Sequence, residues 1–172
     1  MKNYFKFLDV LALGIVSCEP ELDNPIADGG VYTSGDADFS NFVAVGNSLT
    51  AGFADDALYV QGQQNSYPQI LADQFSLVGG GEFVQPLTND NTGGLLLNGT
   101  QIVDNRFVLA FDAMGNPGPA VYTGESPTTD ISNVISGPFN NMGVPGAKSF
   151  HLGLPGYGNI ANFPAAANPY FV

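Results

Sequence analysis

The chain has 172 residues, of which 44% are hydrophobic, and a net charge of −12. This length allows one domain, and the hydrophobic fraction excludes a disordered chain. Sixteen acidic residues against four basic ones repel phosphate backbones and anionic lipid surfaces, so nucleic acid is excluded as a partner. The 22 glycines and 12 prolines predict that much of the domain is loop.

The first 18 residues have the pattern of an export signal. Lys2 and Lys6 precede an apolar run over residues 7–17, which is too short to cross about 30 Å of hydrocarbon. Residues 15–18 (Ile-Val-Ser-Cys) resemble a bacterial lipobox, which implies that residues 1–17 are a lipoprotein signal peptide and that Cys18 is acylated. The alternative is a buried N-terminal helix with an inert cysteine, which Asp9 within the apolar run favours.

Residues 18–40 form the expected tether between lipid and domain. They contain two prolines and many Gly, Ser and Asp residues without an apolar period, which predicts a flexible, solvated segment. Without residues 1–17 the chain has two basic and fifteen acidic residues, a net charge of about −13. The acidic residues after Cys18 resemble the surface-export signals of some Bacteroidetes lipoproteins. We therefore expect a lipid-anchored protein of the bacterial cell envelope, at the outer membrane, with its side of the membrane undetermined.

A short apolar run over residues 42–46 ends in a small polar turn that carries Ser48. The run predicts a buried strand, and the turn lies at its carboxyl end, where open α/β sheets hold their ligand sites. Residues 46–53 (Gly-Asn-Ser-Leu-Thr-Ala-Gly-Phe) resemble the first motif of the GDSL (SGNH) esterase and lipase family. That motif is usually Gly-Asp-Ser-Leu, followed by small residues, a glycine and an aromatic residue.

The resemblance implies a catalytic role for Ser48, as nucleophile and as an oxyanion N–H donor. Gly46, Leu49 and Gly52 match the family motif, whereas Asn47 replaces the usual aspartate. Both Asn and Asp tolerate tight turns and bond to nearby backbone. The implied fold is α/β, a flavodoxin-like three-layer sheet.

A helix is predicted over residues 66–77. Ser66 is its N-cap, Pro68 lies in the first turn, and Ile70, Leu71 and Phe75 recur at helical spacing. The glycines at residues 79–81 end it. Strand, serine loop and helix thus follow in the order that opens a βαβ unit.

Residues 81–140 predict an inserted β-rich region. Apolar runs at residues 93–103 and 106–111 precede a turn-rich run at residues 115–119, and we expect hairpin turns at Asn98-Gly99 and Asp104-Asn105. Residues 88–93 resemble part of a calcium loop, but Thr100 stands where an EF-hand needs its twelfth, acidic residue. We expect no metal and no cofactor.

Residues 139–149 resemble the family's second motif, a strand leading to a glycine whose N–H joins the oxyanion hole. Gly146 matches that glycine, which lets backbone approach a reacting carbonyl without a Cβ in the way. The alternative is an ordinary Gly/Pro turn.

The family base is a histidine preceded three residues earlier by aspartate, near the C-terminus. His151 is the only histidine, and Lys148 stands three residues before it, so we interpret His151 as a pocket or packing residue. The family's Gly-x-Asn-Asp motif, whose Asn donates to the oxyanion, is absent from the sequence.

Together these features predict the N-terminal part of a longer, truncated SGNH-type lipoprotein, with residues 41–172 forming an incomplete hydrolase-like domain. The expected chemistry is ester hydrolysis through an acyl-enzyme, on a small-molecule, glycan or lipid ester. Because the base is missing, we expect this chain to be inactive by itself and to fold poorly or associate when expressed from Glu19. The alternative function is a non-catalytic surface lipoprotein that binds glycan or an envelope partner.

Overall fold

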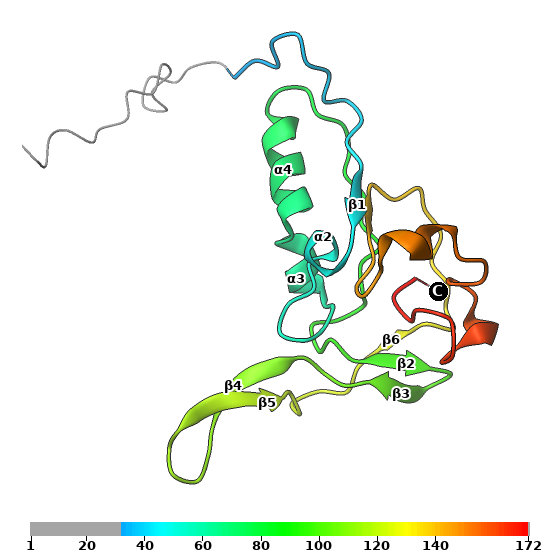
Figure 1. The fold of residues 1–172 in the computed structure, drawn as a ribbon. Coiled ribbons are helices and arrows are strands. Elements are labelled where there is room, and N and C mark those ends of the chain that lie inside the picture. The colour runs from blue at the N-terminus through cyan, green and yellow to red at the C-terminus, as the bar shows by residue number, and fades with distance from the viewer. Residues whose placement is uncertain (1–31, 172) are drawn as a thin grey trace, which may run out of the picture. The chain divides into compact units, whose positions relative to one another are not determined.

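The computed structural model describes residues 32–171 (Figure 1). The expected signal peptide, Cys18 and most of the tether lie outside the described residues. One compact unit begins at Ser34, so residues 34–40 belong to it as well as to the expected tether. Phe39 explains why, because its ring stacks on Phe75 at 4.6 Å and its carbonyl accepts a hydrogen bond from the N–H of Gly81.

The described chain is a mixed α/β structure with short helices and three small sheets. In chain order its elements are β1 (Ala44–Gly46), α2 (Ser48–Ala51), α3 (Val60–Gln64), α4 (Tyr67–Ser76), β2 (Leu95–Leu97), β3 (Thr100–Val103), β4 (Phe107–Phe111), β5 (Pro117–Val121), β6 (Thr129–Asp130), β7 (Asn141–Gly143) and the 3-10 helices η2 (Ser149–Gly153) and η3 (Ile160–Asn162).

β1 and β7 form a two-stranded parallel sheet, as the runs before the two motifs predicted. The prediction that the first strand is buried is wrong, because Ala44 alone of β1 is buried and Val45 is 61% exposed. Ala44 lies opposite Asn141 and Gly46 opposite Gly143. Backbone hydrogen bonds continue at both ends, from Ala44 N–H to the carbonyl of Asn140 and from Val144 N–H to the carbonyl of Gly46. The carboxyl ends of the two strands therefore lie side by side, although almost 100 residues separate them in sequence.

The helix predicted after the serine loop is confirmed as α4, with Ser66 at the N-cap position and Pro68 in its first turn. Its buried face is not the expected one. Pro68 and Ala72 are buried, while Ile70 and Leu71 remain 53% and 39% exposed. Helical spacing alone did not identify the covered face, because small residues make the close contact.

The hairpin turn predicted at Asn98-Gly99 is confirmed between β2 and β3, and both residues have positive φ, 50° and 79°. Asp130 on β6 holds this turn, since its carboxylate accepts hydrogen bonds from the N–H groups of Asn98 and Gly99. Those bonds, after the stronger ones from Ser132, lower the pKa of Asp130 to about 2.

The turn predicted at Asp104-Asn105 is wrong as a hairpin. β3 pairs with β2, whereas β4 pairs with β5 in a separate sheet. Asn105 is buried in the connection, where its side chain donates to the carbonyls of Tyr122 and Glu125. Asn105 therefore lies in a connection between two sheets and does not close a hairpin.

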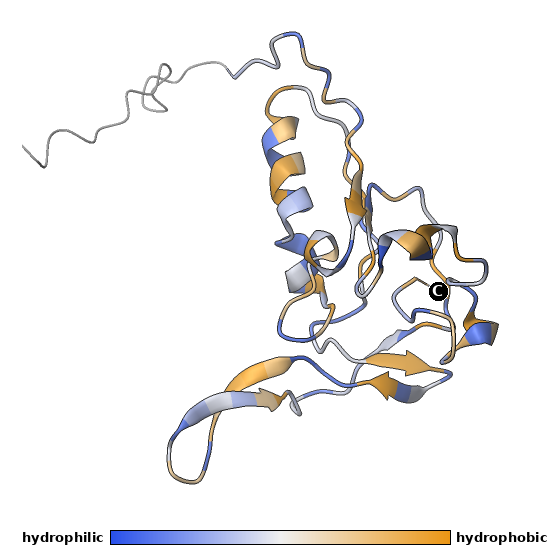
Figure 2. Ribbon diagram, viewed as in Figure 1, coloured by the Kyte–Doolittle hydropathy of each residue, from blue (hydrophilic) through white to orange (hydrophobic). Residues whose placement is uncertain are grey.

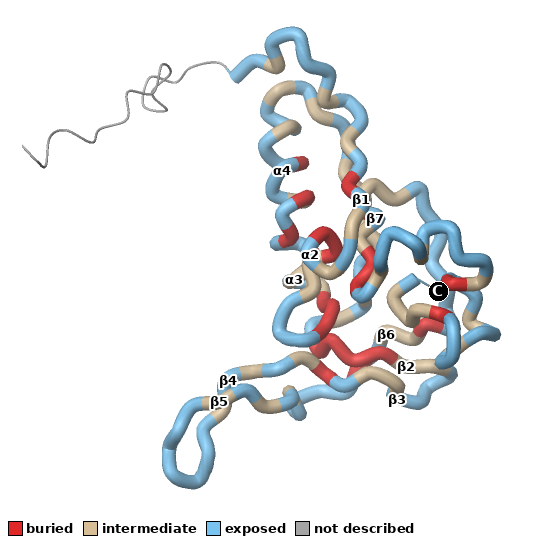
Figure 3. The backbone as a smooth tube through the Cα atoms, viewed as in Figure 1, coloured by how far each residue is buried: buried red, intermediate tan, exposed pale blue. Residues whose placement is uncertain are grey.

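Buried positions gather in α2, in the segment that leads into α3, and in the run that leads into β2 (Figure 3). Leu95 on β2 and Ala57 before α3 are almost fully covered, at 2% and 0% exposure. Among residues 32–171, no helix has the length and apolar character needed to cross a bilayer.

Candidate active site

Ser48 is the first residue of α2 and lies directly beyond the end of β1. Two glycines shape this corner. A Cβ on Gly46 would collide with the side chain of Thr50, whose hydroxyl is 3.0 Å from that of Tyr67. Gly52 ends α2 with φ 82°, and a Cβ there would collide with the carbonyl of Gly62. The small residues of the motif therefore let the chain turn sharply between β1 and α3.

The remaining motif residues are Asn47 and Leu49. Asn47 gives α2 no side-chain cap, although its carbonyl accepts the N–H of Ala51 at 3.0 Å. Leu49 is 73% exposed.

Gly146 follows β7 as Ser48 follows β1, and the structure brings these two residues together. The N–H of Gly146 donates to the Ser48 hydroxyl oxygen at 3.4 Å. Gly146 has φ 76°, a conformation that glycine adopts without strain. Of the residues singled out from sequence, Ser48 and Gly146 are in direct contact, which places the Gly146 N–H beside the Ser48 oxygen.

Asn141 fixes the spacing between the two strand ends. It is 2% exposed, its Nδ2 donates to the carbonyl of Thr50 and to Gln85 Oε1, each at 2.9 Å, and its Oδ1 accepts the N–H of Gly143. Sequence reasoning missed this residue, since a single asparagine in a short strand carries no signal of burial.

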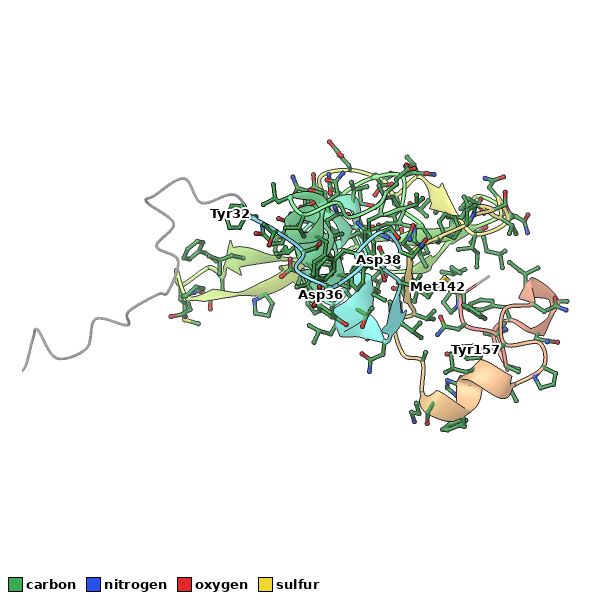
Figure 4. The ribbon with its side chains drawn as sticks, turned by 90° about the horizontal axis from the view of Figure 1, so that it is seen from above. Tyr32, Asp36, Asp38, Met142 and Tyr157 are labelled. Atoms are coloured by element: carbon green, nitrogen blue, oxygen red, sulfur yellow. The ribbon has the colours of Figure 1, made fainter. Side chains whose placement is uncertain are left out.

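A cavity of about 720 Å³ opens beside the serine. Its lining comes from the serine corner, the turn after β7, η2 and the C-terminal coil: Ser48, Phe53, Pro145, Gly146, His151, Leu154, Tyr157, Ala165, Ala166, Ala167, Asn168, Pro169 and Tyr170. Figure 4 shows Tyr157 beside η2 on this side of the molecule. The cavity places His151 near the serine corner and is lined chiefly by apolar and aromatic groups.

His151 is not arranged as a base for Ser48. Its Nδ1 accepts the N–H of Lys148 at 3.2 Å, and its ring lies against Phe150 and Tyr157. In the neutral imidazole one ring nitrogen is an acceptor and the other carries the proton. With Nδ1 as the acceptor, Nε2 carries the proton and has no lone pair with which to deprotonate serine.

Asn168 is a second residue that sequence reasoning missed. Its Nδ2 donates to the carbonyl of Pro145 at 2.8 Å and to the hydroxyl of Tyr157 at 2.7 Å. These bonds hold the turn that presents Gly146. Nothing in the sequence predicted a role for this residue.

Tyr170 lines the cavity next to the serine motif. Its ring meets Phe53 edge-on, with centroids 6.0 Å apart. Burial, with a smaller effect from the charge of Asp56, raises the pKa of Tyr170 to about 12, so its hydroxyl is neutral at physiological pH and takes no part as a base.

Residues 32–171 contain no group of three or more His, Cys, Asp or Glu side chains arranged to hold a metal ion. In the segment that resembles part of a calcium loop, Asp90 accepts hydrogen bonds from the backbone and hydroxyls of Thr92 and Thr128. Burial opposes its ionisation, but these bonds together outweigh it and lower the pKa of Asp90. Both carboxylate oxygens are occupied in fixing loops.

Comparisons with models of known families, with curated proteins and with solved structures find no match to this chain. The chemistry assigned to the site therefore depends on the sequence motifs and the geometry described above.

Proposed function

We propose that this chain carries the nucleophile and part of the oxyanion hole of an ester hydrolase of the SGNH type. The observation that carries the proposal is the 3.4 Å contact between the Ser48 hydroxyl and the N–H of Gly146, at the adjacent carboxyl ends of two parallel strands. A flavodoxin-like three-layer arrangement is the fold in which such an edge forms a ligand site.

In the proposed reaction the Ser48 oxygen attacks the ester carbonyl carbon while a base takes its proton. The N–H groups of Ser48 and Gly146 stabilise the resulting oxyanion. The N–H of Ser48 is free for this role because the first N–H groups of a helix such as α2 lack helical partners. Collapse of the tetrahedral intermediate releases the alcohol and leaves an acyl-serine, which water then hydrolyses to acid and free enzyme.

Residues 32–171 place no general base at Ser48, because the acceptor nitrogen of His151 already accepts a hydrogen bond. A serine hydroxyl is a weak nucleophile at neutral pH without such a base. We therefore expect this chain alone to hydrolyse aryl esters no faster than Ser48→Ala, and a base supplied from solution to restore Ser48-dependent turnover.

The same proposal places the protein at the bacterial outer membrane, anchored through an acylated Cys18. Its substrate is a small-molecule, glycan or lipid ester. The mainly apolar lining of the cavity supports an ester with an uncharged acyl group.

The test is hydrolysis of 4-nitrophenyl acetate by the chain, Ser48→Ala and His151→Ala, with and without added imidazole. We expect no difference among the three without imidazole. With imidazole, the chain and His151→Ala should exceed Ser48→Ala, whose rate gives the background of imidazole itself.

Two outcomes contradict this account. Ser48-dependent activity without imidazole that is lost in His151→Ala would make His151 the base. Equal rates of the chain and Ser48→Ala at every imidazole concentration would favour the non-catalytic surface lipoprotein, in which the serine loop is a structural turn.

A further inference from the structure

The β4–β5 hairpin presents one continuous apolar face to solvent. Side chains of a strand alternate between its two sides, and here Phe107, Leu109 and Phe111 share one side with their cross-strand partners Val121, Pro119 and Pro117. Exposure is 71% for Leu109 and 65% for Phe111. Figure 2 shows β4 as a strongly hydrophobic strand in an extended hairpin.

Charge is almost absent from this hairpin. Asp112 is the one ionisable residue in residues 107–121, and it lies in the turn. Its carboxylate accepts the N–H groups of Met114 and Asn116 and the side-chain amide of Asn116. Asp112 therefore serves the turn, while Met114 at the tip is 85% exposed.

Backbone geometry argues against a further strand as the occupant on the β5 side. Hydrogen bonds join Tyr122 to Arg106 and Asp112 to Asn116. Alternation along the antiparallel ladder then turns the backbone nitrogens of Pro117 and Pro119 away from β4. Proline has no N–H, so this edge lacks two of the donors that strand addition needs.

The root of the hairpin is firmly held. Phe107 N–H donates to the carbonyl of Asp55 at 2.7 Å, and the Arg106 guanidinium lies over the rings of Tyr59 and Tyr122, 5.1 and 5.4 Å from their centroids. The start of the hairpin is thus held by contacts that include the loop after α2, and the apolar face extends from it.

We infer that the β4–β5 hairpin docks on a lipid surface, inserting the side chains of Leu109, Phe111 and Met114 among the acyl chains of zwitterionic lipid. The uncharged apolar face favours an apolar medium over a polar partner, and the prolines disfavour a further strand on the β5 side. The net charge of −12 excludes attraction by anionic headgroups. This docking is independent of the chemistry proposed for Ser48 and goes beyond it.

The test uses the full chain with Cys18→Ser, so that no acyl group contributes to binding. The sequence has no tryptophan, so Phe111→Trp introduces a single reporter into this background. We expect its emission to shift to the blue on phosphatidylcholine vesicles and to be quenched by brominated acyl chains. Ile70→Trp, on the exposed side of α4, is the control and should show neither effect.

A second pair of variants measures what the apolar face contributes to binding. Leu109→Asp should lower partition into phosphatidylcholine vesicles about tenfold or more, because a charge then enters the apolar contact. Leu152→Asp on η2 is a matched control, since Leu152 is 74% exposed, and should change partition by less than about twofold. Circular dichroism checks that both variants fold.

Three results would overturn the inference. Equal partition of the two aspartate variants would show that the hairpin is not the contact. Stronger binding when anionic phosphatidylglycerol replaces part of the phosphatidylcholine would show an electrostatic mode. A dimer by light scattering that Leu109→Asp converts to monomer, with no vesicle binding by the parent chain, would make a second copy the occupant.

Discussion

The β1–β7 pair and the β4–β5 hairpin are built in opposite ways. In the first, buried polar side chains join distant parts of the chain, as Asn141 joins β7 to the carbonyl of Thr50. In the second, the strands lie a few residues apart in sequence, and large side chains such as Leu109 face solvent. The comparison indicates that the serine site depends on long-range contacts, whereas the hairpin depends on its local ladder and leaves its apolar face available.

The largest difference in free energy of unfolding should come from substituting two glycines that have the same backbone conformation. Gly52 and Gly115 have φ of 82° and 83°, but a Cβ at Gly52 would collide with the carbonyl of Gly62, while Gly115 faces open space. Gly115→Ala should cost only the strain of positive φ, about 1–2 kcal/mol. Gly52→Ala should cost more than about 3 kcal/mol in free energy of unfolding, because strain and collision add. Urea unfolding measures both, and equal costs would contradict the close packing of α2 on α3.

Alanine variants of two asparagines should show a smaller difference in free energy of unfolding. Asn141→Ala removes partners from the buried carbonyl of Thr50 and from Gln85, so we expect a loss of about 2–3 kcal/mol. Asn116→Ala in the hairpin turn removes one exposed hydrogen bond to Asp112 and should cost less than about 1 kcal/mol. The same urea experiment compares them. A loss at Asn116 as large as at Asn141 would contradict the difference between the two regions.

The sequence predicted features that depend on local contacts and did not predict those that depend on distant contacts. β1, α4 with Ser66 at its N-cap, and the turn at Asn98-Gly99 were predicted because their signals lie within a few residues. The role of Asn168 was not predicted, because its partner Pro145 is 23 residues away and the segment between them has no period. The turn at Asp104-Asn105 was wrong because the same residue types that close hairpins also connect separate sheets.

The smallest expected effect concerns pH and the hairpin turn between β2 and β3. Asp130 has its pKa lowered from 3.8 to about 2. A carboxyl with a lowered pKa stabilises the fold above its unfolded pKa, and this contribution is lost as the pH falls from about 4 to about 2. Asp130→Asn should therefore lose less stability across this range than the parent chain. Thermal unfolding between pH 5 and pH 2 checks this, and parallel Tm profiles would contradict it.

The measurement that tests the central claim most directly is the position at which a fluorophosphonate modifies the chain in the presence of imidazole. Mass spectrometry of peptides compares Ser48 with exposed serines such as Ser132. Because the N–H of Gly146 lies beside the Ser48 oxygen, where it can stabilise the charge that develops on the attacked phosphoryl oxygen, we expect Ser48 to react at least about tenfold faster than the other serines. Modification spread evenly over the serines would contradict the assignment of Ser48 and Gly146 as the nucleophile and oxyanion donor of an esterase.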